Sequence, residues 1–427
     1  MHILKRLFEK SRPMKSYFGL CLFSVLVLVA CSDEDLCVQR VSYTKAVGIY
    51  ADLDPLRSDD LNGEPRLLRN PGKIYVSDQL ILIGEEGEGI HVVDNSDPTS
   101  PSFINFLEIP GNREMFVMGN LLYADSYFDM LLVDISDPGN TRLTERLEEA
   151  FPPRLRDELN RPLIDFHLEN VYEELACDVY IQEGSMVYFD FKGERIPESA
   201  IPTSFVASGS DQIGTVNRMA HVNDHLYVIG SHDLYVFEVS DNQLNRGSHH
   251  EYFSWEMETI YPMNDLLFVG SINRMNIYNT IQPLEPQFEG EFFHATSCDP
   301  VLPTPEEVAY VTLRSGNECP GDENTLNIID ISSVQNPRLI TSIGLTSPYA
   351  MSISNGLLFV GEGHAGYRVY EIDGLNLNEI VHDPDITAYD IIAHPSDPNI
   401  VLFAGPDGIT QYNMDGLDLS LLSQIDY

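Results

Sequence analysis

The sequence of 427 residues predicts an all-β fold, a β-propeller, most simply one with seven four-stranded blades. Short apolar runs that end in an acid or an amide recur about every 41 residues from Lys73 onward. A turn-forming pair with Asn or Gly precedes most of these ends by about twelve residues, in phase with them. The runs are short and rich in β-branched and aromatic residues, which favours buried strands over helices.

The clearest apolar run is residues 131–138, which read Leu-Leu-Val-Asp-Ile-Ser-Asp-Pro. Its first acid defines a slot that holds a carboxylate or an amide in each copy: Asp94, Asp134, Glu238, Asn279, Asp330, Glu371 and Asn413. Such side chains accept backbone N–H groups in the turn that follows them. We therefore interpret the slot as part of the scaffold and not as a repeated metal site.

The second repeat unit predicts its four strands most plainly, at residues 115–118, 121–124, 130–135 and 142–147. The seven units span about residues 73–110, 113–149, 217–254, 256–293, 299–343, 348–381 and 387–427. The last unit contains its own outer strand, at 419–425, while residues 46–50 form a further strand that could help to close the ring. Six or eight blades remain alternatives, because an insertion interrupts the repeat.

The repeated stretch at 131–138, with its Gly-Asn-Leu-Leu-Tyr partner at 119–123, resembles the LVIVD repeat of bacterial secreted proteins and lipoproteins. The resemblance covers most of residues 73–427 outside the insertion and is strongest around Asp94, Asp134 and Asp330. It implies a β-propeller on the cell surface. It implies no defined ligand or reaction, so it assigns no functional residues.

Residues 1–30 predict a lipoprotein signal peptide. A basic start precedes an apolar stretch that is short for a membrane span. The sequence Leu28-Val29-Ala30-Cys31 resembles a bacterial lipobox, which implies lipid attachment at Cys31. The acidic residues at 32–35 resemble the signal that sends Bacteroidota lipoproteins to the outer face of the outer membrane. An uncut anchor and a periplasm-facing protein are the alternatives. Residues 31–72 are expected to form an acidic tether and an N-terminal strand.

The chain is strongly acidic. Its formal net charge is −41, and removal of residues 1–30, which hold five bases and one acid, leaves −45. This charge disfavours nucleic-acid partners and flat binding to anionic lipid, so we expect membrane contact through the lipid alone. No cofactor motif is present, although bound Ca²⁺ is a possible reason for the acidity. Besides Cys31, which is expected to carry the lipid, four cysteines remain in the mature chain, and we favour pairing Cys298 with Cys319 and Cys37 with Cys177 over free thiols.

Propeller geometry places the A–B and C–D turns on one face, called the turn face below, and the B–C and D–A loops on the other, called the loop-rich face. The predicted insertions all lie on the loop-rich face. A mixed insertion of about residues 150–216 separates blades 2 and 3, with a short helix expected at 170–176 and a strand at 185–191. Ten further residues extend a B–C loop around 315–325. Elaborated loops on a rigid scaffold are the usual place for binding.

Candidate ligand-binding residues follow from this geometry. The entries of the inner strands place Arg113, Arg218, Glu258 and Tyr349 in one slot, with Tyr389 or Asp390 close by, and Trp255 in a neighbouring loop. The B–C loops add Tyr127, His364 and Tyr367. The arginines could bind an anion or could neutralise acids across the channel mouth. Trp255 could stack on a ligand or pack between blades.

No catalytic motif is found: the chain has no nucleophile elbow, phosphate-binding loop, dinucleotide fingerprint or His-Glu-x-x-His sequence. We therefore expect a non-enzymatic propeller that binds a protein, peptide or glycan through its loop-rich face. One alternative is an extracellular hydrolase or lyase with carboxylates in the central channel. Another is a structural subunit of an outer-membrane assembly.

Overall fold

The computed structural model describes residues 38–176, 181–182, 184–196, 218–230, 232–240, 243–252, 257–271, 273–294, 300–315 and 321–427. The chain divides into two compact units. The smaller unit comprises residues 1–43 and 171–185, and the larger comprises 44–170 and 186–427. Among the residues described, no helix has the length and apolar character needed to cross a membrane.

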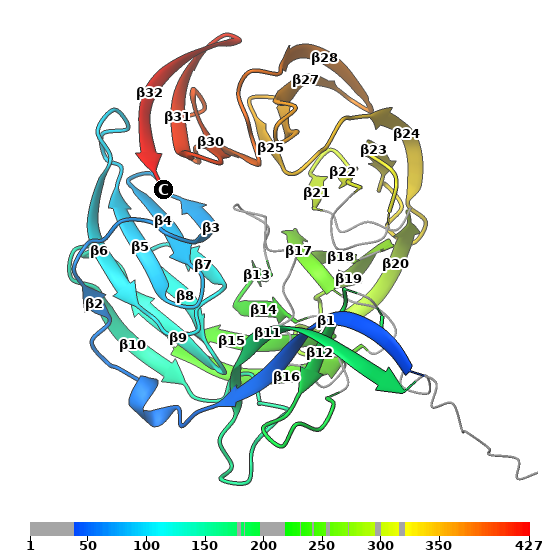
Figure 1. Cartoon of the computed structure of the whole chain (residues 1–427). Helices are drawn as coiled ribbons and strands as arrows, with labels where there is room; N and C mark the ends of the chain where they lie inside the picture. The colour runs from blue at the N-terminus through cyan, green and yellow to red at the C-terminus, as the bar shows by residue number, and fades with distance from the viewer. Residues whose placement is uncertain are drawn as a thin grey trace, which may run out of the picture. The chain divides into compact units, whose positions relative to one another are not determined.

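The described residues of the larger unit form seven antiparallel blades, each of which runs in chain order from an inner strand A to an outer strand D (Figure 1). Blade 1 consists of β3 (Pro71–Val76), β4 (Leu80–Glu85), β5 (Gly89–Asp94) and β6 (Ser102–Glu108). Blade 2 consists of β7 (Met115–Met118), β8 (Leu121–Ser126), β9 (Asp129–Asp134) and β10 (Arg142–Leu147). Blade 3 consists of β13 (Met219–Val222), β14 (His225–Ile229), β15 (Asp233–Ser240) and β16 (Gln243–Glu251), and blade 4 of β17 (Met257–Met263), β18 (Leu266–Ser271), β19 (Arg274–Asn279) and β20 (Gln287–Phe293).

Blades 5 to 7 are β21 (Val301–Thr304), β22 (Val308–Leu313), β23 (Thr325–Asp330) and β24 (Arg338–Gly344); β25 (Met351–Ser354), β26 (Leu357–Gly361), β27 (Tyr367–Asp373) and β28 (Asn376–Asp383); and β29 (Asp390–Ala393), β30 (Ile400–Gly405), β31 (Gly408–Asp415) and β32 (Asp418–Asp426). Blade 1 carries a fifth strand, β2 (Asn62–Gly63), beside β6. The predicted fold class and the count of seven blades are thus confirmed.

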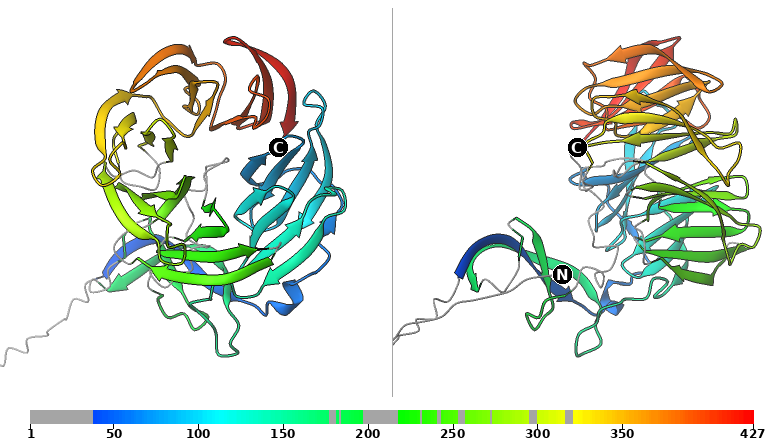
Figure 2. Two further views of the ribbon diagram at one scale, coloured as in Figure 1. Left: turned by 180° about the vertical axis from the view of Figure 1, so that it is seen from behind. Right: turned by 90° about the vertical axis from the view of Figure 1, so that its right-hand side faces the viewer.

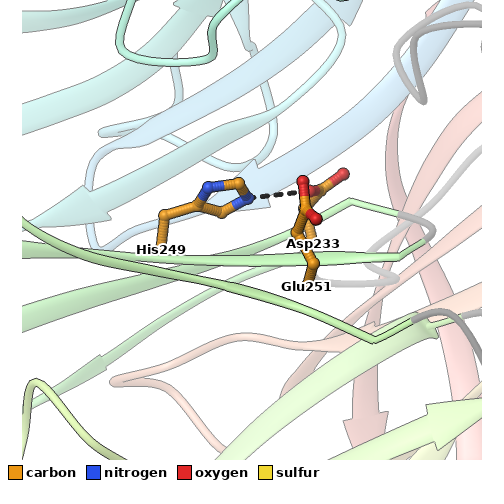
Figure 3. A group of neighbouring side chains, drawn as sticks. All are labelled: Asp233, His249 and Glu251. Carbon is orange, nitrogen blue, oxygen red and sulfur yellow. Dashed lines mark hydrogen bonds and ion pairs between the residues drawn. The ribbon is translucent and has the colours of Figure 1, made fainter.

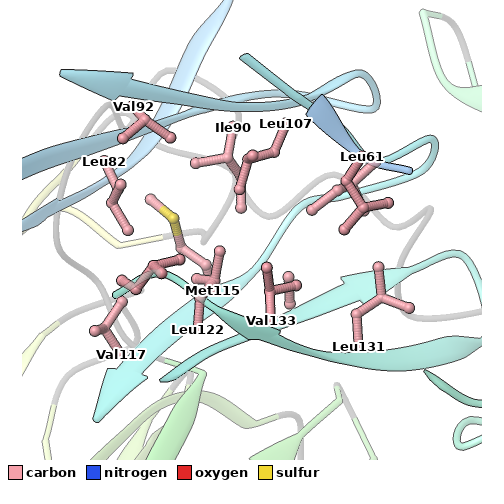
Figure 4. Close-up of a cluster of buried hydrophobic side chains, with 13 residues drawn as sticks. Leu61, Leu82, Ile90, Val92, Leu107, Met115, Val117, Leu122, Leu131 and Val133 are labelled. Carbon is pink, nitrogen blue, oxygen red and sulfur yellow. The ribbon is translucent and has the colours of Figure 1, made fainter. Parts of the chain in front are cut away.

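Each pair of neighbouring blades shares a cluster of buried apolar side chains, and blade 7 shares one with blade 1. Figure 4 shows the cluster between blades 1 and 2, where Ile90 and Val92 lie opposite Met115 and Val133. In the left view of Figure 2, the red C-terminal blade lies beside the blue and cyan first blade, where blades 7 and 1 share a cluster. Successive side chains of a strand point to opposite faces of the blade, and each face packs against a neighbouring blade. Every blade is therefore buried on both faces, which explains its near-continuous apolar runs.

None of the described strands is shared between the first and last blades, so side chains close the ring. Asn95 in blade 1 and Gln411 in blade 7 are fully buried and exchange two amide hydrogen bonds. Asn95 Nδ2 donates to Gln411 Oε1 at 3.0 Å, and Gln411 Nε2 donates to Asn95 Oδ1 at 2.7 Å. The Ser423 hydroxyl also donates to the Pro98 carbonyl across the same seam, at 2.7 Å. Blade 7 owns its outer strand, as predicted.

Local sequence explains the regular turns on one face. The A–B turns at Asn223, Asn264 and Asn355 adopt φ values of 51° to 55°, a region that Asn tolerates better than most residues. On the outer side, the C–D pair of every blade changes register once, as in β31–β32 between Gln411 and Tyr412. A bulge of this kind increases strand twist, which suits the outer strand of a propeller blade.

The segment that leads into β2 crosses from blade 2 to blade 1. The Arg57 guanidinium donates from Nε and Nη2 to the two carboxylate oxygens of buried Asp129, at 2.8 and 2.9 Å. Further along, Asn62 Oδ1 accepts Asn105 Nδ2 at 2.7 Å and the Thr141 backbone N–H at 2.9 Å. A bidentate pair and a shared amide thus join this segment to two blades at once.

In the rest of the chain, the ring-closing role suggested for residues 46–50 and the helix expected at 170–176 were wrong, whereas both predicted strands are present. The strand predicted at 46–50 is part of β1 (Val38–Tyr50), which joins no blade and lies between β11 (Leu163–Ala176) and β12 (Met186–Phe189) in a three-stranded sheet. The predicted helix at 170–176 is the end of β11. Pairing with β1, far away in sequence, overrides the local helical preference. The strand expected at 185–191 is β12.

The reciprocal amide pair makes ring closure testable. Gln411→Leu should lower the free energy of unfolding by about 1–3 kcal/mol, because the buried Asn95 amide loses its partner. The double variant with Asn95→Leu should lose less than the sum of the two single variants, because both polar groups are then removed together. Denaturant unfolding of all four proteins measures this coupling. Additive losses would contradict the assignment.

Candidate functional site

The acidic slot of the repeat lies on the turn face and serves the turns. Asp94, Asp134 and Asp330 each accept through Oδ1 the backbone N–H of the serine two residues on, at 2.9–3.0 Å. The Ser136 hydroxyl and N–H hold the pKa of Asp134 below its usual range, and Ser332 does the same for Asp330. The prediction of a scaffold role is therefore confirmed for these copies.

The loop-rich face brings polar side chains to the entries of the inner strands. The strand register resolves the single slot expected from the sequence into two successive positions. The first position holds Arg113, Glu258, Tyr349 and Tyr389, and the second holds Lys73, Glu114, Arg218 and Asp390. Arg218 thus lies one place further along its strand than Arg113 does.

The second position forms a charged arc, which we define as Asp390, Lys73, Glu114 and Arg218 in the order of blades 7, 1, 2 and 3. Charge alternates in sign along the arc. Lys73 Nζ lies 3.4 Å from Glu114 Oε2, and the lysine side chain is only 7% exposed. Burial lowers the pKa of Lys73; Glu114 and Asp390 oppose this shift, and Arg218 adds to it. The alternation favours the interpretation of Arg218 as a neutralising charge.

Asp125 fixes the backbone on which part of this arc is built. Its Oδ1 atom accepts the N–H groups of Arg113 and Glu114 at 2.8 and 2.9 Å, and Nδ2 of Asn112 at 2.9 Å. Burial raises the pKa of Asp125 to about 7, although the two backbone N–H groups act in the opposite direction. Arg113 itself reaches Glu86 at 3.4 Å, so this arginine also has an acidic partner.

Blades 5 to 7 bring an aromatic cluster to the same face, defined as Arg314, Tyr349, His364 and Tyr389. The Tyr349 and Tyr389 rings meet edge to face with centroids 5.0 Å apart. The Tyr389 hydroxyl lies 2.9 Å from His364 Nε2, and Arg314 Cζ lies 3.9 Å from the centre of the Tyr349 ring. His364 is exposed and both tyrosines are half-buried. Since Tyr389 precedes Asp390, the cluster borders the charged arc.

The remaining candidates from the sequence lie in different surroundings. Tyr367 is a correction: it is 3% exposed and packs between blades 6 and 7, with its ring centroid 4.9 Å from that of Phe403. Tyr127 is half-buried, and its pKa is raised mainly by burial and to a smaller extent by the charge of Asp165. Glu258 is half-buried in β17. Other candidates lie outside the described residues: Trp255, Cys31, Cys37, Cys177, Cys298 and Cys319.

Blades 1 and 6 each contain a buried carboxylate that pairs with a basic side chain at the end of strand B. Glu85 lies 2.7 Å from His91 Nε2, and Glu362 lies 2.6 Å from Arg368 Nε, with both carboxylates almost fully buried. Burial alone would raise the pKa of Glu85, but hydrogen bonds from His91 and nearby backbone hold it below its usual range. Burial lowers the pKa of His91, so a neutral imidazole donates to a charged carboxylate. These pairs are structural.

A third carboxylate group on this face resembles a metal site. Asp233, His249 and Glu251 converge from β15 and β16 with ligand atoms within 4.8 Å of one another (Figure 3). His249 Nε2 lies 2.8 Å from Asp233 Oδ1. Arg154 Nη2, however, lies 2.9 Å from both Asp233 oxygens and 3.7 Å from Glu251. The guanidinium supplies the charge that a metal would supply, so we interpret the group as an anchor for the start of the insertion.

A family model for the LVIVD repeat matches residues 69–106 and 113–148, which cover blades 1 and 2. The chain carries LVIVD repeats. The other five blades of this LVIVD-repeat propeller keep the same strand order as the two matched ones. No curated protein matches the chain.

Solved structures similar to the LVIVD-repeat propeller include two proteins described as lactonases. The periplasmic gluconolactonase of Pseudomonas aeruginosa has a TM-score of 0.53 at 12% identity, over 82% of this chain and 96% of that chain. A proposed 6-phosphogluconolactonase from Bacteroides fragilis has a TM-score of 0.51 at 11% identity, over 85% of this chain and 97% of that chain. At such identities the likeness shows the propeller fold alone and leaves catalysis undecided.

Asp125 gives the LVIVD-repeat propeller a predictable pH dependence. Its folded pKa of about 7 exceeds the usual value of 3.8, so the folded state holds the proton more tightly than the unfolded state does. The contribution of Asp125 to the free energy of unfolding is therefore complete below about pH 4. As the pH rises through 7 this contribution is lost, which lowers the free energy of unfolding by up to about 4 kcal/mol. Asp125→Asn mimics the protonated form and should remove this part of the decline.

The measurement is the free energy of unfolding of the wild type and the variant between pH 4 and pH 8. Asp97→Asn is the matched control, because Asp97 is an exposed carboxylate whose bonds to Thr99 lower its pKa. If the pH dependence of the free energy of unfolding is the same in Asp125→Asn and the wild type, the role assigned to Asp125 is wrong.

Arg154 makes a second prediction. Arg154→Ala should let the Asp233–His249–Glu251 group bind Zn²⁺ at least about tenfold more tightly than the wild type does, a difference of about 1.4 kcal/mol. Titration calorimetry measures the affinity. Arg156→Ala is the control, since Arg156 pairs with Glu149 instead. Equal Zn²⁺ affinity in all three proteins contradicts the role given to Arg154.

Proposed function

We propose that this chain is a surface-anchored lipoprotein whose LVIVD-repeat propeller binds a protein, peptide or glycan through its loop-rich face. One observation carries the proposal. On the turn face, the repeated acids are engaged by their own turns, whereas the loop-rich face presents partly exposed tyrosines and charges at the entries of the inner strands. Aromatic side chains beside a few fixed polar groups are typical of ligand sites.

The contacts behind that entry support binding more than catalysis. Side chains that could act as acid or base are engaged with bases or backbone donors: Glu114 with Lys73, and Asp233 with Arg154 and His249. A ligand site gains from such fixed positions, because little conformational entropy is lost on binding. The net charge of −41 repels nucleic acid, so the proposed partners do not include it. In this proposal the protein contacts the membrane through its N-terminal lipid only.

A hydrolase is the second candidate, because Asp125, whose pKa is about 7, lies beside the entry of the inner strand of blade 2. A group with a pKa near the working pH suits general acid–base catalysis. The two lactonase structures make sugar lactones the first substrates to test. Lactone hydrolysis by the wild type that disappears in Asp125→Asn would favour this candidate over simple binding.

The anchoring part of the proposal is tested in the native host. The full chain should incorporate labelled palmitate, and Cys31→Ser should abolish the label. External protease should then degrade the wild-type protein in intact cells, as expected for the outer face of the outer membrane. Labelling that persists in Cys31→Ser, or complete protection from protease, contradicts the anchor or its orientation respectively.

The binding part is tested with the full chain on glycan and peptide arrays and by affinity capture from the cell surface. Binding should weaken when Tyr127, a half-buried candidate of the loop-rich face, is replaced by Ala. It should remain unchanged when Asn279 is replaced by Ser on the turn face, where its Oδ1 accepts the Ile281 N–H. A folded wild-type protein that binds nothing in any format counts heavily against the proposal.

A further inference from the structure

We infer that the aromatic cluster of Arg314, Tyr349, His364 and Tyr389 is a subsite for a neutral pyranose ring of a glycan. This inference rests on the proposed binding function of the loop-rich face and names the ligand class. The cluster draws its members from four different positions, on three blades, that the fold brings together. Repeat periodicity does not require such a meeting, because the equivalent positions of blades 1 to 4 hold other residue types.

The backbone around the cluster leaves room for the rings. Gly363 adopts a φ of 57°, and a Cβ atom at this position would lie 2.5 Å from the Tyr349 ring. The Gly363 N–H also donates to the Ala388 carbonyl at 2.8 Å, and the Ala388 N–H donates back at 3.1 Å. These two bonds tie the B–C loop of blade 6 to the residue before Tyr389. The rings are thus held at a fixed separation by backbone contacts.

The chemistry of the cluster matches a sugar. The face of a tyrosine ring carries partial negative charge, which attracts the positively polarised C–H groups of a pyranose face. Sugar hydroxyl groups need donors and acceptors at the rim of such a platform. The Tyr389 hydroxyl and the exposed imidazole of His364 lie 2.9 Å apart and offer both. Tyrosine supplies this contact at low entropic cost, because it has only two side-chain torsions.

Charge selects a neutral glycan over an acidic one. The single cation of the cluster, Arg314, is 9% exposed and lies over the Tyr349 ring, where it faces the protein more than the solvent. Asp390 follows Tyr389 directly, and the whole chain carries a net charge of −41. An acidic polysaccharide would meet repulsion at long range. A neutral glycan loses nothing from the surrounding acids.

The test uses the full chain and a panel of neutral oligosaccharides, namely hexasaccharides of glucose, mannose, xylose and galactose with different linkages. Titration calorimetry or ligand-observed NMR should find binding to at least one of them. Tyr389→Ala should weaken that binding about tenfold, the loss of one stacked ring at roughly 1.4 kcal/mol. Tyr389→Phe keeps the ring and should retain most of the affinity.

Tyr172→Ala is the matched control, because Tyr172 is an exposed tyrosine on β11, 69% accessible to solvent, outside the blades. Unfolding midpoints of all variants establish that each is folded. Equal affinity in Tyr389→Ala and wild type overturns the inference while the proposed binding function stands. Binding of peptides alone overturns the glycan assignment, and failure of both ligand classes removes the proposed function as well.

Discussion

Packing between neighbouring blades is the interaction on which this structure depends. No blade can bury its two apolar faces alone, and each of the seven shared clusters is completed only by the next blade. The ring therefore requires a good fit at its last seam. Here that seam joins blades 7 and 1 through apolar side chains and one reciprocal amide pair, Asn95 with Gln411. A buried amide pair adds direction to a contact that apolar packing alone would leave less specific.

The two faces of the ring use polar side chains differently. On the turn face, each Asp of the repeat accepts a backbone N–H close in sequence, so its contribution is local and repeats with the blade. On the loop-rich face, buried carboxylates such as Asp129 and Asp233 pair with bases from elsewhere in the fold. The first arrangement maintains the scaffold, and the second positions loops. Function is expected where side chains are positioned by such long-range contacts and are still reached by solvent.

How far the sequence predicts this structure depends on the range of the interactions involved. Strand D of blade 2 was predicted at the bounds of β10, because apolar pattern and turn residues are local signals. The channel entries were predicted only approximately. Blade 4 shifts register between Met257 and Thr259, which sequence spacing does not show. Lys73 was overlooked as a site residue, although it directly precedes the first apolar residue of its strand. Strand β11 was taken partly for a helix, since its partner β1 is distant in sequence.

Self-contained blades have a consequence for how such chains change over evolutionary time. Many closed rings would be broken by gain or loss of one repeat if their closing strand came from the opposite end of the chain. In this protein every blade is one uninterrupted stretch of sequence that contains its four strands. Duplication or deletion of a single gene segment would therefore add or remove a complete blade with its loops. The seam between first and last blade would keep the same residues, and the number of blades becomes a property that recombination can alter in one step.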